Sequence, residues 1–392
     1  MRLLVTADIH LGSPIRSVAL RNPDLGDRLK QASRDTFAEI IDLAISEQVD
    51  ALVLAGDIFD NGYPDLKSRA FLIAQLARAS EAGVPTVLIR GNHDALLDHK
   101  AHGDLGPNIH LLHKGAPTVE IGGTAFHGLS FDAAHVAKSF LPDYPRPVPG
   151  KRNVGLMHTS LDGAQGHDPY APCAERDLMA HGYDLWCLGH IHAPFERLDG
   201  SVLAVMPGIP QPRHFGERNG GSVTFVSLSE GAPEFERRAI GYLGFSECAL
   251  DLRTCSDQQE VLLSLRDAFI SAQVPGRDVA VRLHVTSDRH GTELVTELAA
   301  EVLDSIDRVF LDKVKSAPPP RKPGAETDDL VRLMQDELAE EGFRQAALQQ
   351  LEELRLALPS EIMDELDEGG LDALLEEAIA EVSLTLHAGA SQ

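Results

Sequence analysis

Short, largely apolar runs alternate with longer amphipathic stretches over residues 1–238. Five of the runs are typical of buried strands, and they are Leu3–Val5, Ala51–Leu54, Thr86–Ile89, Val154–Met157 and Asp184–Leu188. Between them, Arg34–Glu47 and Leu66–Ala82 have apolar residues at helical spacing, and Gly83-Val84-Pro85 predicts the end of the second helix. This alternation predicts a layered α/β or α/β/α sandwich.

The pattern changes after residue 238 and predicts a small α+β domain over residues 239–316. Its expected elements alternate between strand and helix, and they are Phe245–Leu252, Asp257–Ala272, Asp278–Val285 and Glu293–Leu303. The run Pro318-Pro319-Pro320 then predicts a stiff, extended linker over residues 317–326.

Residues 327–392 are acidic and have the apolar spacing of helices. Apolar stripes include Leu330, Leu333, Met334 and Leu338, and later Leu348, Leu351, Leu354 and Leu358. A small helical subdomain that packs on itself and a docking segment for the helices of a partner would both produce this pattern. Amphipathicity alone does not separate the two interpretations.

The charge of the chain is uneven. The formal net charge is −25, and residues 326–392 contribute −15 of it, from 18 acidic residues and 3 arginines. Such a balance argues against general coating of nucleic acid by the whole chain. It does not argue against a nuclease whose substrate phosphate meets bound cations, because those cations dominate the local charge.

Other bulk features point to a protein of the cytoplasm. No apolar run approaches the roughly 18 residues that a membrane span needs, and the first residues carry no signal-peptide cleavage pattern. The four cysteines form no C-x-x-C pair, and this number in 392 residues is no disulfide framework. We therefore expect a cytoplasmic protein that has no contact with a membrane.

Side chains that bind metal ions follow each of the five predicted strands. They are Asp8 with His10, then Asp57, Asn92, His158, and His190 with His192. Each has a structural interpretation when taken singly, such as a helix cap or a turn. Together they are expected to converge, because layered α/β sheets place their sites at the carboxyl ends of strands. Extended backbone would also turn Asp8 and His10, at positions i and i+2, toward one ion, and His190 and His192 have the same spacing on a turn after their strand.

The set of donors indicates the chemistry. It mixes imidazole nitrogen with carboxylate and amide oxygen and has no thiolate, which suits Mn²⁺, Mg²⁺, Fe or Zn²⁺. Two such ions, roughly 3.5–4 Å apart, serve in-line displacement at phosphorus. The sequence therefore predicts a two-metal phosphoesterase.

Taken in order, these motifs resemble the calcineurin-like metallophosphoesterase superfamily. They are Asp8-Ile9-His10, Gly56-Asp57-Ile58-Phe59-Asp60, Gly91-Asn92-His93-Asp94, the single His158, and Gly189-His190-Ile191-His192. Two details resemble its DNA repair exonuclease branch, the SbcD-like and YhaO-like nucleases. Asn61-Gly62 stands where protein phosphatases usually have Arg-Gly, and Pro207–Glu217 is similar to a P-G-x-x-Q-x-R-H segment of that branch.

The resemblance implies a four-layer α/β/β/α sandwich with a small α+β capping domain and a C-terminal helical segment. It also implies two metal positions that share Asp57: one has Asp8, His10, Asp57 and His192, and the other has Asp57, Asn92, His158 and His190. Mn²⁺ is the first expectation for both. His93 matches the catalytic histidine of the family and is expected to protonate or stabilise the departing sugar oxygen.

The sequence leaves the roles of four neighbouring polar residues open. Asp60 or Asp94 could orient His93, and the sequence does not choose between them. Arg213 and His214 are candidates for holding a substrate phosphate, since arginine can fork onto phosphate oxygens. A structural ion pair is an equally good interpretation of Arg213.

The resemblance favours a DNA phosphodiesterase, a 3′–5′ exonuclease with a single-strand endonuclease activity left open, that acts in DNA repair with a coiled-coil, SMC-like ATPase. A homodimer through the early helix Leu66–Ala82 is also left open, because the apolar residues of that helix would equally suit packing on the sheet. Two alternatives stand beside this interpretation. One is a small-substrate phosphodiesterase or phosphatase with the same site, and the other is a non-catalytic scaffold for an ATPase.

Overall fold

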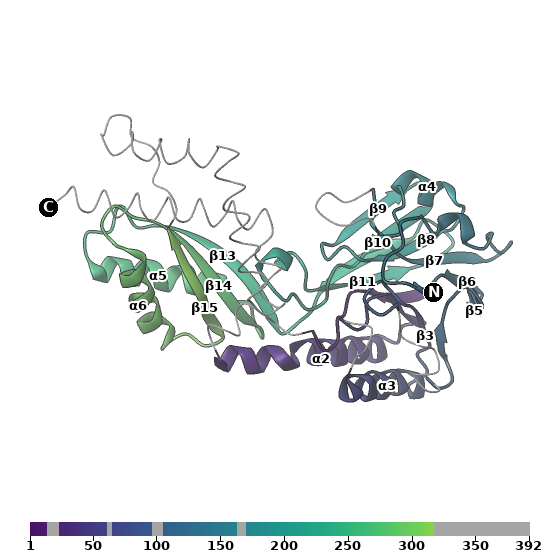
Figure 1. Ribbon diagram of the computed structural model, residues 1–392, viewed down its shortest axis with the longest axis horizontal. Helices are drawn as coiled ribbons and strands as arrows, with labels where there is room; N and C mark the ends of the chain where they lie inside the picture. Colours follow the sequence, from purple (N-terminus) through teal and green to yellow (C-terminus); the bar gives the residue numbers. More distant parts are fainter. Residues whose placement is uncertain (14–22, 61–64, 96–104, 163–169, 317–392) are drawn as a thin grey trace. The chain divides into compact units, whose positions relative to one another are not determined.

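The computed structural model describes residues 1–13, 23–60, 65–95, 105–162 and 170–316 (Figure 1). Its contacts divide the chain into two units. The first comprises residues 1–13 and 27–243, and the described part of the second comprises residues 23–26 and 244–316. The predicted linker and the acidic segment, residues 317–392, lie outside the described residues, and the predicted domain boundaries remain a prediction.

The first sheet of unit one has six strands in the order β12-β11-β1-β2-β3-β4. Their bounds are Arg2–Thr6 for β1, Ala51–Ala55 for β2, Thr86–Ile89 for β3, Ile109–Leu111 for β4, Ser222–Ser227 for β11 and Glu234–Ala239 for β12. Strands β1 to β4 are parallel, and β11 and β12 add an antiparallel edge. The carboxyl ends of β1, β2 and β3 therefore meet at one edge of this sheet.

The second sheet also has six strands, in the order β5-β6-β7-β8-β10-β9. Their bounds are Thr118–Ile121 for β5, Thr124–Gly128 for β6, Arg152–His158 for β7, Leu185–Gly189 for β8, Phe195–Asp199 for β9 and Val202–Met206 for β10. The four central strands are parallel, and the edge strands β5 and β9 are antiparallel to their neighbours.

The two sheets pack face to face over an apolar core. One face of each sheet supplies the buried side chains of this core, among them Leu3, Val53 and Val87 from the first sheet and Val154, Leu185 and Val205 from the second. Burying such a side chain contributes about 1.5–3 kcal/mol relative to leaving it exposed. Parallel strands covered on both faces read as continuous apolar runs, and for this reason they were visible in the sequence.

Helices cover the outer faces of both sheets. Helices α2 (Pro23–Ser46) and α3 (Leu66–Glu81) pack on the first sheet, where Phe37, Ile41 and Leu76 join its outer core. The short α4 (Glu175–Ala180) contributes Leu178 to the outer core of the second sheet, beside Trp186. The order of layers is α/β/β/α, which confirms the predicted fold class.

Helix α3 shows how its sequence determines its position. The Asp65 carboxylate caps its first turn by accepting hydrogen bonds from the backbone N–H groups of Lys67 and Ser68. Its buried residues recur at helical spacing, and they are Ser68, Leu72, Leu76 and Ala79. This stripe packs on the first sheet, which accounts for the apolar residues of the helix without a second chain. The homodimer stays an untested prediction.

The second unit is a small α+β structure. Its sheet has the order β13-β14-β15, and its elements along the chain are β13 (Leu243–Asp251), α5 (Gln258–Ala272), β14 (Asp278–Thr286), α6 (Thr292–Leu303) and β15 (Val309–Ser316). Val261, Leu265 and Phe269 of α5 join Val295 and Ala299 of α6 in one apolar core. Strand β15, parallel to β14, was not predicted. Among the described residues, no helix is both long and apolar enough to cross a bilayer.

Candidate metal centre

Strand register brings the polar strand ends together. Parallel pairing aligns Leu3 of β1 with Ala51 of β2, and Leu52 of β2 with Thr86 of β3. In the second sheet, His158 is the partner of Gly189 across β7 and β8. The loops after these strands therefore leave their sheets at the same edge, where every one of the seven predicted ligands lies.

The backbone of these loops differs from the expected extended form. Asp8, His10, Asp57 and His190 have φ values of 53°, 47°, 49° and 98°. Residues other than glycine seldom adopt such values, and residues held there cluster at functional sites. Hydrogen bonds between loops hold this conformation, since Asp8 N donates to Gly56 O at 3.0 Å and His10 N to Asp57 O at 3.1 Å. Asp8 and His10 thus lie in left-handed backbone, and the extended i, i+2 geometry expected of this pair was wrong.

Two glycines allow the loops to approach closely. Gly56 has a φ of 95°, which turns the chain directly before Asp57. A Cβ atom on Gly91 would lie 2.1 Å from Asp57 Oδ1 and 2.7 Å from the Asp57 backbone nitrogen. Only glycine at position 91 therefore leaves room for the carboxylate of Asp57.

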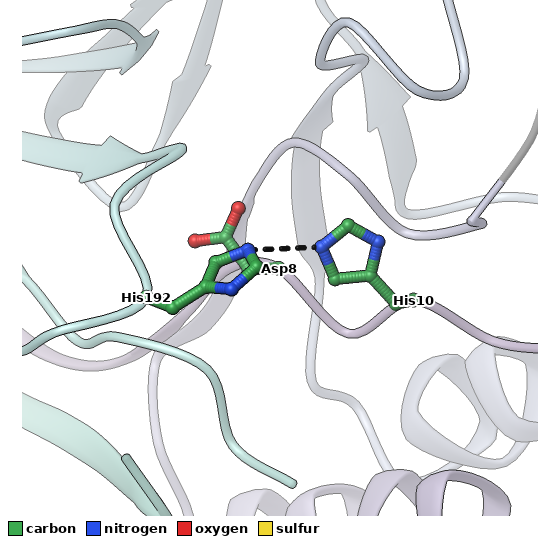
Figure 2. A group of neighbouring side chains, drawn as sticks. All are labelled: Asp8, His10 and His192. Carbon is green, nitrogen blue, oxygen red and sulfur yellow. Dashed lines mark hydrogen bonds between the residues drawn. The ribbon is translucent and has the colours of Figure 1, made fainter. Parts of the chain in front are cut away.

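Figure 2 shows the first group of converging side chains, Asp8, His10 and His192. The two imidazoles face one another with their Nε2 atoms 3.2 Å apart. One ligand atom from each of the three residues lies within 4.8 Å of the other two. Asp8 is held by the backbone N–H of His190, which donates to Oδ1 at 3.0 Å and to Oδ2 at 3.1 Å.

A second group lies beside the first and shares Asp8 with it: Asp8, Asp57 and His158. His158 Nε2 is 3.2 Å from Asp57 Oδ2 and 3.0 Å from Asn92 Oδ1. The same Asn92 oxygen lies 3.2 Å from Nδ1 of His190. The backbone carbonyl of Ala55 accepts a 3.0 Å hydrogen bond from His158 Nδ1, which presents Nε2 to the site.

The electrostatics of this edge favour a cation. Burial and the neighbouring Asp57 raise the pKa of Asp8. Burial also raises the pKa of Asp57, but His158 outweighs this effect and holds it well below its usual range. Burial lowers the pKa of His158, but Asp57 outweighs this effect and raises the pKa to about 9, so an ion bound here would replace the proton of this imidazole. Burial and Arg213 lower the pKa of His10 to about 3, so its ring is neutral at neutral pH, as a metal ligand must be.

The residues present fit a pair of divalent ions. Asp8 and Asp57 are buried, and buried carboxylates require compensating positive charge. Imidazole nitrogens, carboxylate oxygens and an amide oxygen are donors suited to such ions, and their atoms lie at ligand-to-ligand separations. The site is therefore a candidate binuclear centre, and the assignment of individual ligands to ions remains a prediction.

His93 borders this centre. Its backbone N–H donates to Asp57 Oδ1 at 3.0 Å, and its ring lies edge-on to His10 with centroids 4.9 Å apart. Nδ1 donates a 2.7 Å hydrogen bond to the backbone carbonyl of Asp60. The side chain is 43% exposed, which leaves the ring accessible to a substrate.

The carboxylate of Asp94 binds backbone N–H groups, whereas the sequence offered it as a candidate for orienting His93. Its Oδ1 accepts a 2.7 Å hydrogen bond from Gly91 N and its Oδ2 a 2.9 Å bond from Ile58 N. It thus joins the loop after β2 to the loop after β3. Burial and Asp57 raise the pKa of Asp94 to about 6. Of the two residues considered as orienting His93, Asp60 is the one in contact with its ring.

Arg213 lies between two carboxylates. Its Nη1 donates to Asp60 Oδ1 at 3.0 Å and its Nη2 to Glu217 Oε1 at 2.8 Å. Nη1 also donates to Ser13 Oγ at 3.2 Å. The ion-pair interpretation therefore describes its contacts here, and a phosphate contact stays a prediction. His214 is 53% exposed and lies 3.3 Å from Glu217 Oε1.

Two residues of the segment Pro207–Glu217 have structural tasks that the sequence did not assign. Glu217, 6% exposed, accepts a 2.6 Å hydrogen bond from Nδ1 of His192. Gln211, 2% exposed, accepts from Thr36 Oγ1 at 3.1 Å and donates to Leu243 O at 3.0 Å, which ties this segment to α2. The P-G-x-x-Q-x-R-H match contained a signal for Gln211, but none for Glu217.

Comparisons with known proteins define the class. Residues 1–194 match the family model of calcineurin-like phosphoesterases. This part of the chain is a calcineurin-like metallophosphoesterase domain, in agreement with the two-sheet fold and the polar edge. The matched residues thus belong to the metallophosphoesterase class of hydrolases, whose members use divalent metals.

Among the relatives is the uncharacterized metallophosphoesterase YhaO of Bacillus subtilis (strain 168), 28% identical over 71% of this chain and 69% of that protein. Another is the DNA double-strand break repair protein Mre11 of Sulfurisphaera tokodaii, 27% identical over 60% of this chain and 62% of that protein. The solved structure of a dimetal phosphatase from Danio rerio is 14% identical with a TM-score of 0.38, over 61% of this chain and 98% of that one. The chain spans less than two thirds of the Mre11 relative.

Proposed function

We propose that this chain is a two-metal DNA phosphodiesterase, a 3′–5′ exonuclease that acts in DNA repair together with a coiled-coil ATPase. The observation that carries the proposal is the convergence of the seven candidate ligands where the strand ends of the two sheets meet, with the exposed ring of His93 beside them. The similarity to proteins named for DNA double-strand break repair supports DNA as the substrate. Mn²⁺ is the proposed ion, and the cytoplasm the proposed compartment.

Each metal position would draw on the groups that already face each other. Asp8, His10, Asp57 and His192 would hold one ion, and Asp57, Asn92, His158 and His190 the other. When bound, the ions lower the pKa of water and neutralise charge on phosphoryl oxygens. The neutral ring of His10 and the ionised carboxylate of Asp57 are the protonation states that this ligand role requires.

His93 would act on the leaving group. Its Nδ1 is committed to the carbonyl of Asp60, so Nε2 is the nitrogen left to donate a proton to the departing sugar oxygen. The hydrogen bond from its backbone N–H to Asp57 fixes the ring beside the carboxylate that both ions would share. In this proposal His93 handles a proton and is not one of the seven ligands.

The test uses purified protein and DNA labelled at either the 3′ or the 5′ end, single- or double-stranded, with Mn²⁺. Bis-p-nitrophenyl phosphate serves in parallel as a small phosphodiester, and His93→Ala is the control variant. Stepwise shortening from the 3′ end by the wild type alone supports the proposal. Cleavage of the small ester without any action on DNA, with or without an ATPase partner, would replace it by a small-substrate phosphodiesterase.

A further inference from the structure

The two histidines in Figure 2 differ from His158 in how their outer nitrogens are supported. Nδ1 of His192 donates to Glu217 Oε1 at 2.6 Å, and Nδ1 of His10 lies 3.2 Å from Asp60 Oδ1. Nδ1 of His158 instead meets a neutral acceptor, the backbone carbonyl of Ala55. One predicted metal position thus has a carboxylate beside the outer nitrogen of both imidazoles, hydrogen-bonded to His192 and at ion-pair distance from His10.

Arg213 joins the two supporting carboxylates. Its guanidinium contacts Asp60 Oδ1 at 3.0 Å and Glu217 Oε1 at 2.8 Å, and its backbone N–H donates to Glu217 Oε2 at 2.7 Å. Both oxygens of Glu217 are therefore occupied, and its side chain is only 4% exposed. Such a carboxylate has a single position available to it, and that position determines the ring orientation of His192.

We propose that Glu217 is a positioning residue for the ion held by His10 and His192, and that Arg213 links it to Asp60 as one clamp behind both rings. The proposal rests on the two-metal centre of the proposed function. It distinguishes the two metal positions, because Glu217 would support only one of them. A carboxylate behind an imidazole fixes its tautomer and raises its basicity as a ligand, and its loss typically weakens metal binding about 10- to 100-fold. Because Glu217 touches neither His158 nor Asn92, the second ion should bind as before.

Glu217→Gln is the most informative variant. Glutamine has nearly the same shape, but its amide brings donors toward the N–H groups of Arg213 and removes the charge behind His192. Glu217→Asp keeps the charge that Arg213 needs and withdraws the carboxylate from His192, so it serves if the glutamine variant does not fold. Glu196→Gln is the matched control, because Glu196 of β9 pairs with Arg237 of β12, a carboxylate–arginine pair that includes none of the site residues.

The measurement is a titration of the metal-free full-length chain with Mn²⁺, with free Mn²⁺ followed by electron paramagnetic resonance. The wild type and Glu196→Gln are expected to bind two ions. Glu217→Gln or Glu217→Asp should bind one ion with unchanged affinity and the other about 10- to 100-fold more weakly. Circular dichroism confirms that each variant is folded.

The possible outcomes distinguish a failure of the clamp from a failure of the two-metal centre. Two ions bound by the variants with wild-type affinities would overturn the clamp and leave the two-metal centre standing. Equally weakened binding of both ions would also overturn it, because Glu217 would then not act on one metal position alone. A wild-type chain that binds fewer than two ions would overturn the metal centre itself, and the clamp with it.

Discussion

The backbone carbonyl of Asp60 accepts a 2.7 Å hydrogen bond from Nδ1 of His93, while the carboxylate oxygen of the same residue lies 4.0 Å from that nitrogen. The carboxylate is engaged elsewhere, 3.2 Å from His10 and 3.0 Å from Arg213. Asp60 therefore serves two residues with two different groups. Its main chain orients the histidine proposed to act on the leaving group, and its side chain supports a proposed metal ligand.

His93→Ala should separate catalysis from metal binding. Loss of a positioned acid typically lowers turnover about 10²- to 10⁴-fold. The backbone N–H that contacts Asp57 remains in this variant, and the ring it removes is 43% exposed, so the ligands should stay in place. Turnover of end-labelled DNA, whose leaving group is a sugar oxygen, and metal content by mass spectrometry give the two readouts. A variant that loses its metal along with its activity would contradict the assignment of His93 as a non-ligand.

Asp94→Asn should destabilise the fold. The Asp94 carboxylate accepts one hydrogen bond with each oxygen, from Gly91 and Ile58, and the amide of asparagine can accept only one of them. A buried N–H without an acceptor costs about 1–3 kcal/mol. Urea unfolding of the metal-free chain measures this loss. Asp199→Asn, at an exposed position of β9, is the control and should unfold like the wild type. If Asp94→Asn is as stable as the wild type, the Asp94 carboxylate does not hold the two loops together.

Gly91→Ala should abolish metal binding by displacement of one carboxylate. The new Cβ would lie 2.1 Å from Asp57 Oδ1, so the carboxylate or the loop must move. Gly244→Ala is the matched control, since a Cβ there meets nothing within 4 Å. Mn²⁺ titration should detect no bound ion in Gly91→Ala, because Asp57 is the ligand that both ions would share. It should detect two bound ions in Gly244→Ala. Two tightly bound ions in Gly91→Ala would show that Asp57 tolerates the shift.

The candidate ligands were predictable because they lie at the ends of continuously apolar strands. Such strands are buried on both faces, and a polar residue at the end of the apolar run stands out, as His158 does after Val154–Met157 at the end of β7. The edge strands β5 and β9 were missed for the opposite reason. Their burial alternates or is absent, as in Thr118–Ile121, and they are too short for a periodic signal.

Supporting residues could not be read from the chain in the same way. Glu217 lies 25 positions from His192 and in a 3-10 turn, Phe215–Glu217, so no spacing rule connects the two. Asp94 directly follows His93 in sequence and Asp60 lies 33 positions before it, and only the fold shows which one meets its ring. The left-handed backbone at Asp8 was also beyond sequence reasoning, because inter-loop hydrogen bonds impose it.

Metal removal should lower the stability of the wild-type chain and leave a ligand variant unaffected. An ion that binds only the folded state stabilises it by about 2.7 kcal/mol when its free concentration is 100-fold above the dissociation constant. The buried carboxylates of Asp8 and Asp57 would also lose the positive charge that compensates them. Thermal unfolding with added Mn²⁺, and again with excess chelator, measures the difference. Asp57→Ala lacks the carboxylate proposed to bridge both ions, so its melting temperature should not respond to Mn²⁺. A wild-type melting temperature that is equally indifferent to Mn²⁺ and to chelator would mean that this polar edge holds no ion under those conditions, and the two-metal mechanism would fall.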